Sequence, residues 1–216
     1  MQTQTTMHTA GLQGADGLMD CAQIFSGAVL AVFTCMHMLF LSSVLFGAEA
    51  MNRLSAIFEA IHAEALGGWF IAVVFVVHMA TVTRKIPFKA MQVVEMVRHA
   101  RMVRHADTWR WIAQAVTGCV LMALVSIHLW TGLTDIPVVA QNSAARVQSG
   151  GWLIFYGTLL PILFLHLTIG IWRVAVKTGF ITRELRLRAR KMELYLLAGL
   201  LILASMTLIR LATLSV

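Results

Sequence analysis

The pattern of apolar and polar positions along the chain is dominated by five long apolar segments, separated by more polar connections. A helix needs about 20 predominantly apolar residues to cross the roughly 30 Å hydrocarbon core of a bilayer. Each segment is about that long, so the pattern predicts an all-α, polytopic membrane protein with one membrane domain over residues 1–216. The predicted transmembrane helices cover approximately residues 22–47, 66–84, 110–134, 151–176 and 193–213.

Composition supports the membrane assignment. The chain has 216 residues, of which 59% are hydrophobic and 12% are charged, with a mean hydropathy of +0.79. Charged residues make up about 25% of ordinary soluble domains, so the balance excludes that class. The three cysteines form no C-x-x-C pair, which argues against c-type haem attachment and an iron–sulfur cluster. No internal sequence repeat is evident.

The basic residues are distributed unevenly among the connections. Seven lie in residues 84–110 and seven in residues 173–191, whereas Arg53 and Arg146 stand alone in the other two connections. By the positive-inside rule the two basic connections are cytoplasmic. The N-terminus is then expected inside the cell and the C-terminus outside the cytoplasm. The excess of basic residues is explained by the membrane topology and by a docking surface on the cytoplasmic side. No nucleic-acid partner is therefore expected.

Four of the eight histidines lie deep in the first four predicted helices, one in each: His37, His78, His128 and His166. An unsatisfied polar group in hydrocarbon costs on the order of 2–7 kcal/mol, and these helices hold no matching buried carboxylates. A single such histidine could form a helix–helix hydrogen bond, and several could form the proton relay of a transporter. One histidine in each of four helices fits metal or haem ligation better.

The depth of each histidine indicates its partner. At about 1.5 Å per residue, His78 and His166 lie nearer the cytoplasmic ends of the second and fourth helices. His37 and His128 lie nearer the outer ends of the first and third helices. The sequence therefore predicts two b haems stacked in a four-helix bundle, with an inner pair His78/His166 and an outer pair His37/His128.

Neighbouring residues favour porphyrins over bare metal ions. Gly132 and Gly170 follow ligand histidines by one turn on the same face, where a missing side chain would let a flat macrocycle approach. Arg173 and Lys177 follow His166 at i+7 and i+11, so their cationic ends could reach the propionates of an inner haem. The alternative is that both cations are snorkelling side chains at a helix end, and spacing alone leaves both readings open for Lys177.

Several motifs surround these histidines and the first basic connection. They read F-S-G…H-M, H…R-K-I-P-F, R-H-A-D-T, W-I-A-Q-A-V-T-G…S-I-H-L and H-L-T-I-G-I-W-R-V-A-V-K. In this order, between five helices, they resemble the dihaem cytochrome b membrane anchor of quinol:fumarate reductase and succinate:menaquinone reductase complexes. The resemblance extends from Gln23 to the last helix. It implies that the four deep histidines bind two b haems, with the same pairing that depth indicates.

The resemblance also implies roles for polar residues near the haems. Gln23, Trp111 and Lys177 fall where the family contacts the propionates of the inner haem, and Arg146 falls beside the outer haem. Glu59, in the first outer connection, falls on the family's acidic residue beside the menaquinol site. A carboxylate there can accept a proton released by quinol oxidation. Without the family context, Glu59 would be interpreted as a solvated loop carboxylate.

One position departs from the family pattern. Some members carry a glutamate two residues before the ligand histidine of the fourth helix, where it serves a proton pathway through the membrane. This chain has Phe164 at that position. The substitution puts a proton pathway of that kind in doubt for this protein.

The implied function is electron transfer within a membrane complex. Menaquinol would be oxidised near the outer haem, and electrons would reach an iron–sulfur subunit on the basic cytoplasmic loops, then an FAD flavoprotein that reduces fumarate. The same subunit could serve succinate oxidation, and a dimer of heterotrimers could form. One alternative is the b-type anchor of a nitrate reductase or formate dehydrogenase, which copurifying flavin would distinguish. A second is a transporter with a histidine relay, which haem content would distinguish.

Overall fold

The structure, a computed structural model, describes residues 2–87 and 89–215, so Met1, Phe88 and Val216 lie outside it. Side chains are described from Asp16 onward, apart from that of Ala90. Within the described residues all regular structure is helical, and five helices are long and apolar enough to cross a membrane. The predicted all-α membrane protein with five transmembrane helices is confirmed.

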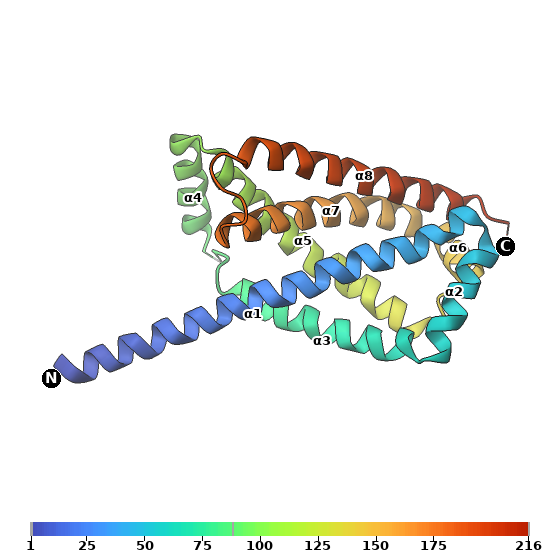
Figure 1. Ribbon diagram of the computed structural model, residues 1–216, viewed down its shortest axis with the longest axis horizontal. Coiled ribbons are helices and arrows are strands. Elements are labelled where there is room, and N and C mark those ends of the chain that lie inside the picture. The colour runs from blue at the N-terminus through green and yellow to red at the C-terminus, as the bar shows by residue number, and fades with distance from the viewer. Residues whose placement is uncertain (1, 88, 216) are drawn as a thin grey trace.

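Four of the long helices form a bundle (Figure 1). They are α1 (Gln2–Ser42), α3 (Ala63–Thr83), α5 (Ala106–Thr134) and α7 (Trp152–Lys177). Each packs against the next along the chain, and α7 also contacts α1, so α1 lies opposite α5 and α3 lies opposite α7. The fifth long helix, α8 (Arg186–Ala212), packs outside the bundle against α7 and α1. Side chains from opposite helices can therefore meet near the bundle axis.

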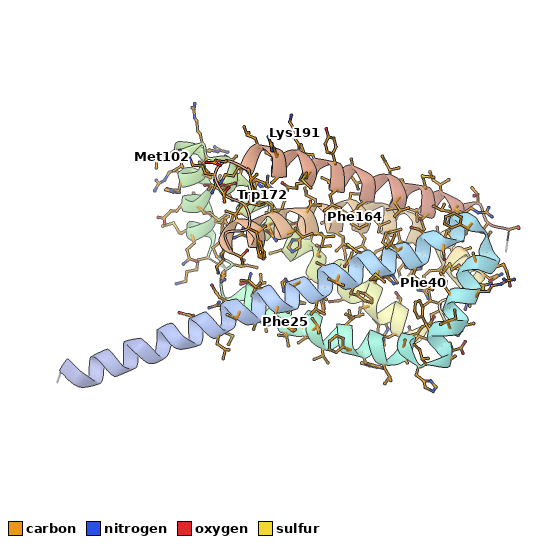
Figure 2. The ribbon with its side chains drawn as sticks, viewed as in Figure 1. Phe25, Phe40, Met102, Phe164, Trp172 and Lys191 are labelled. Atoms are coloured by element: carbon orange, nitrogen blue, oxygen red, sulfur yellow. The ribbon has the colours of Figure 1, made fainter. Side chains whose placement is uncertain are left out.

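Apolar packing joins α1, α7 and α8 midway along the bundle. Met38, Phe164, Leu167 and Ala204 form this buried cluster, and Phe164 is fully buried (Figure 2). The position where some family members carry a glutamate is thus an apolar packing position in this chain.

One end of the bundle carries the short helices α2 (Ala48–Ala60) and α6 (Ala140–Gln148), and we call it the α2/α6 end (Figure 1). The 3-10 helix η1 (Ser43–Phe46) follows α1, and Gly47 then adopts a φ of 118°, which glycine tolerates without a steric penalty. Val44, Met51 and Ala144 are completely buried where η1, α2 and α6 meet the last turns of α8. This apolar contact closes the α2/α6 end.

The opposite end carries α4 (Ala90–Val103) and the connection between α7 and α8, and we call it the α4 end (Figure 1). Both basic connections, residues 84–110 and 173–191, lie here. Between α4 and α5, His105 precedes the first turn of α5, and its Nδ1 accepts a hydrogen bond of 3.3 Å from the backbone N–H of Asp107. The two basic segments of the sequence thus lie together at the α4 end, which makes that end of the molecule basic.

The predicted transmembrane helices agree with the structure in number, and the structure adds helical residues outside the predicted spans. The first helix begins at Gln2 and the last at Arg186, well before the predicted starts at 22 and 193. Helices α2, α4 and α6 lie in segments interpreted as connections. Hydropathy marks only the part of a helix that suits lipid, whereas backbone hydrogen bonding can continue into polar residues.

Candidate functional site

The outer histidine pair meets across the bundle near the α2/α6 end. His37 lies on α1 and His128 on the opposite helix α5, and their ring centres are 6.1 Å apart with an interplanar angle of 58°. A metal–imidazole bond of about 2 Å and about 1 Å from that nitrogen to its ring centre would place two ligating rings about 6 Å apart. The observed separation therefore fits one metal ion held between the two rings.

Aromatic side chains surround this pair. Phe33 stacks on His37 at 5.4 Å, and Phe40 lies 6.5 Å from the same ring. Tyr156 meets His128 edge-on at 5.7 Å. Nδ1 of His128 is buried and has no hydrogen-bond partner among the described residues. An apolar and aromatic setting of this kind suits a flat porphyrin better than a hydrated ion.

The inner pair occupies the other two opposite helices. Nδ1 of His78 on α3 lies 3.0 Å from Oγ of Ser26, and Nδ1 of His166 on α7 lies 3.0 Å from Oγ1 of Thr117. The helices α3 and α7 lie opposite each other in the bundle, as α1 and α5 do. Each of the two predicted pairs thus has its histidines on opposite helices of the bundle.

Neither pair belongs to a larger set of protein ligands. In the described part of the chain, His, Cys, Asp and Glu form no group of three or more that could hold a metal ion. Structural zinc sites use four protein ligands, whereas the porphyrin of a b haem supplies four in-plane nitrogens and leaves two axial positions for protein. Two histidines at each level match the haem requirement.

The residues predicted to contact the inner haem's propionates lie toward the α4 end. Gln23 accepts a hydrogen bond of 2.7 Å from Lys85, and Arg173 donates one of 3.2 Å to the side chain of Gln114. Lys177 forms an ion pair of 2.9 Å with Asp20. Trp111 lines a cavity of about 670 Å³ between α4 and α5, together with Gln92, Glu95, Met96, Arg98, His99, Met102 and Thr108.

Asp20 is a residue that sequence reasoning missed. Besides Lys177, its carboxylate pairs with Lys85 at 2.7 Å and with Arg84. These contacts join α1 to the end of α3 and the end of α7. The sequence signal was weak, because a single acid just before an apolar segment indicates nothing about its partners.

The residues predicted near the outer haem lie toward the α2/α6 end. Arg146 on α6 pairs with Asp135, at the end of α5. Glu59 is exposed in the last turn of α2, so the first outer connection is helical at this residue. The preceding residue, Phe58, packs edge-on against Phe40, which in turn contacts His37. This aromatic contact connects the Glu59 turn to the outer histidine pair.

Glu64, in the first turn of α3, is a further polar residue at the α2/α6 end, and the sequence pattern assigns it no role. Its Oε1 accepts a hydrogen bond of 2.9 Å from the hydroxyl of Ser55, and its Oε2 accepts one of 3.0 Å from the backbone N–H of Val138. One carboxylate thus joins α2, α3 and the connection between α5 and α6. No local sequence pattern predicts this arrangement, since Val138 is 74 residues away from Glu64 in the chain.

The surroundings of Gly132 and Gly170, the two glycines expected to leave room for a macrocycle, differ from each other. A Cβ at Gly170 would lie 2.9 Å from the amide nitrogen of Gln114, so this side chain already fills the space expected for a macrocycle. Gly132 has open space beside it. Two other glycines, Gly27 and Gly118, approach deep histidines, since a Cβ there would lie 3.1 Å from Cε1 of His78 and His166 respectively.

The family match and the similar known proteins agree on one kind of membrane subunit. The family described as succinate dehydrogenase/fumarate reductase transmembrane subunit matches residues 94–208. The fumarate reductase cytochrome b subunit of Helicobacter pylori (strain ATCC 700392 / 26695) is 32% identical over 173 residues, covering 75% of this chain and 67% of that protein. The fumarate reductase cytochrome b subunit of Wolinella succinogenes is 30% identical over 203 residues, covering 88% of this chain and 79% of that protein.

Proposed function

Because the chain belongs to the succinate dehydrogenase/fumarate reductase transmembrane subunit family, we propose that it is the dihaem cytochrome b anchor of a menaquinol:fumarate reductase. The subunit would oxidise menaquinol and pass electrons to partner subunits that reduce fumarate to succinate. The 216 residues would form one membrane domain that carries two b haems and one quinol site.

The observation that carries the proposal is the arrangement of the four deep histidines. Each pair comes from opposite helices of one bundle, and the outer rings are separated by 6.1 Å, as a bis-histidine metal site requires. His37 and His128 would hold the outer haem, and His78 and His166 the inner haem. Bound at these two levels, the haems would supply one-electron transfer between the two faces of the membrane.

The quinol chemistry requires a proton acceptor near the outer haem. Oxidation of menaquinol to menaquinone releases two electrons and two protons, and Glu59 is an exposed carboxylate connected to His37 through Phe58 and Phe40. We assign Glu59 as the acceptor of one of these protons. Arg146, beside Asp135, would lie next to the outer haem.

The α4 end would contain the inner haem's polar rim and the docking face. Gln23, Arg173, Lys177 and Trp111 would hold the propionate edge, exchanging some of their present protein contacts for it. The basic connections at this end would contact an iron–sulfur subunit, followed by an FAD flavoprotein, on the cytoplasmic side. This places the N-terminus in the cytoplasm and the C-terminus in the periplasm of an inner-membrane protein.

Similarity to fumarate reductase cytochrome b subunits supports fumarate reduction as the direction of the proposed reaction. Succinate oxidation by menaquinone would use the same residues in reverse. Fumarate has to gain two electrons and two protons to become succinate, which matches the yield of one menaquinol.

Haem stoichiometry tests the proposal. The complex purified in mild detergent should give two b haems per chain in a pyridine haemochrome assay, together with flavin from the partner subunit. His166→Ala should remove the inner haem, and His128→Ala the outer one. The exposed His62, between α2 and α3, supplies the control, since His62→Asn should keep both haems. One haem or none per chain in the parent complex would refute the proposal.

A further inference from the structure

The two halves of the bundle share a sequence and contact pattern around the inner histidine pair. The pattern Q-x(2)-[ST]-G-x(9)-H occurs at Gln23–His37 on α1 and at Gln114–His128 on α5. The helix that follows carries H-x(6)-[KR], with Lys85 seven residues after its histidine in α3 and Arg173 seven after its histidine in α7. The expectation that the chain has no internal repeat is therefore corrected.

The equivalent residues make equivalent contacts. Ser26 and Thr117 each lie 3.0 Å from Nδ1 of the histidine on the next helix of the bundle. Each neighbouring glycine, Gly27 or Gly118, leaves room for that ring, because a Cβ would lie 3.1 Å from Cε1. We call each hydroxyl–glycine pair a histidine cradle. The glutamines complete the equivalence, since each accepts a hydrogen bond from the cation of its own half.

The cradle of α5 determines which nitrogen of His166 carries the proton. Nδ1 lies 3.1 Å from the backbone carbonyl of Gln114, and a carbonyl oxygen can only accept. The Thr117 hydroxyl directs its own hydrogen to the carbonyl of Ala113 at 2.7 Å, so it too accepts from Nδ1. His166 is therefore the Nδ1–H tautomer, which leaves the Nε2 lone pair for a metal.

The cradle of α1 leads to the same assignment for His78. Oγ of Ser26 lies 2.7 Å from the carbonyl of Ala22, and when the hydroxyl donates to that carbonyl it accepts from Nδ1–H of His78. The outer pair differs, because Nδ1 of His128 has no partner among the described residues and aromatic rings surround the site. The two levels thus hold their imidazoles by different means.

We infer that Ser26 and Thr117 are positioning residues that orient the two inner-haem histidines, set their Nδ1–H tautomer and lower the reduction potential of that haem. A ligand imidazole that donates its distal N–H becomes a stronger electron donor to the metal. Stronger donation favours ferric over ferrous iron, so the hydrogen bonds lower the potential. The inference rests on the proposed dihaem function.

The test is a redox titration of the purified full complex. Ser26→Ala and Thr117→Val delete the hydroxyl, whereas Ser26→Thr and Thr117→Ser retain it. The inner haem, identified by the spectral component that His166→Ala removes, should shift to higher potential in the two deletion variants. It should keep nearly the parent potential in the two conservative variants. The outer haem should keep its potential throughout.

A second pair of measurements tests the close approach of the rings. Gly27→Ala and Gly118→Ala should lower inner-haem occupancy while the outer haem is retained. Gly199→Ala on α8, where a Cβ meets nothing within 4 Å, is the matched control and should bind both haems. Full occupancy with unchanged ligand spectra in both cradle variants would contradict the assigned role of the glycines.

The outcomes separate this inference from the function on which it rests. A parent complex without two b haems refutes the proposed function. A parent with two haems, and hydroxyl-deletion variants whose inner haem shows no shift and no loss, overturns the inference alone. If a hydroxyl-deletion variant does not assemble, the conservative variant at the same position, Ser26→Thr or Thr117→Ser, is used to test the inference. Normal assembly of the conservative variant supports a need for the hydroxyl. Failed assembly shows that the size of the side chain matters instead and overturns the inference at that position.

Discussion

Replacement of Glu64 tests how the α2/α6 end is held together. Its carboxylate accepts hydrogen bonds from the hydroxyl of Ser55, which is 1% exposed, and from the backbone N–H of Val138. A hydrogen bond to a charged group contributes about 1.5–3 kcal/mol, and partial exposure of Glu64 favours the low end of that range. Glu64→Ala should therefore lower the free energy of unfolding by roughly 2–4 kcal/mol.

The chain offers a matched control in Glu49, which pairs with Arg53 one turn along α2. Both side chains of this pair are more than 70% exposed, so Glu49→Ala should cost no more than about 0.5 kcal/mol. For a chain of this size 1 kcal/mol corresponds to roughly 2–4 °C in Tm. Thermal unfolding in detergent should then show a loss of roughly 5–15 °C for Glu64→Ala and about 2 °C or less for the control.

Two further measurements sharpen the comparison. Glu64→Gln keeps the shape and one acceptor oxygen, so its Tm should fall between those of the parent and Glu64→Ala. Since Ser55 lies one turn before Glu59 on α2, Glu64→Ala should also slow quinol oxidation while both haems remain bound. If Glu64→Ala and Glu49→Ala lowered Tm equally, the carboxylate would not join these segments and the reasoning would fail.

Three other predictions follow from the site. Glu59→Gln should keep both haems but largely abolish quinol-dependent fumarate reduction, because an amide cannot accept the proton. Activity with an artificial donor to the partner subunits should persist. A near-normal rate of quinol oxidation would show that Glu59 is an ordinary surface carboxylate. A reporter fused at Val216 should be active only outside the cytoplasm, and the opposite pattern would reverse the assigned orientation. Asp20→Asn removes a negative charge at the proposed position of the inner haem and should raise the reduction potential of that haem. The effect should weaken at high salt, because the ion-pair cluster of Asp20, Lys85 and Lys177 is partly exposed. An unchanged potential at low salt would show that Asp20 does not influence that haem.

Several features of the site could be read from single residues. A histidine deep in hydrocarbon requires a partner wherever it occurs, and depth along a helix follows from residue number at a fixed rise. His37, His78, His128 and His166 could therefore be found and paired without coordinates. The two basic connections could also be placed at one end of the bundle from the sequence, since alternate connections between successive membrane spans lie on the same side.

Other features depended on contacts between distant segments. The local sequence assigns no structural role to Glu64 or Asp20, because the residues they contact lie on other segments of the chain. The glycines beside His78 and His166 could not be identified from their own helices either. A residue four positions away on one helix shares its face, but which face meets a neighbouring helix depends on how both are rotated.

The sequence by itself determined the membrane class, the five spans, the uneven charge and the depth of the four histidines, because these follow from local hydropathy, composition and helical rise. Only the tertiary structure decided that α1 lies opposite α5 and α3 opposite α7, and that Ser26–Gly27 and Thr117–Gly118 contact His78 and His166. The physical reason is that hydropathy specifies which part of a helix can lie in the membrane. Rotation and neighbours are set by side-chain packing and hydrogen bonds between helices.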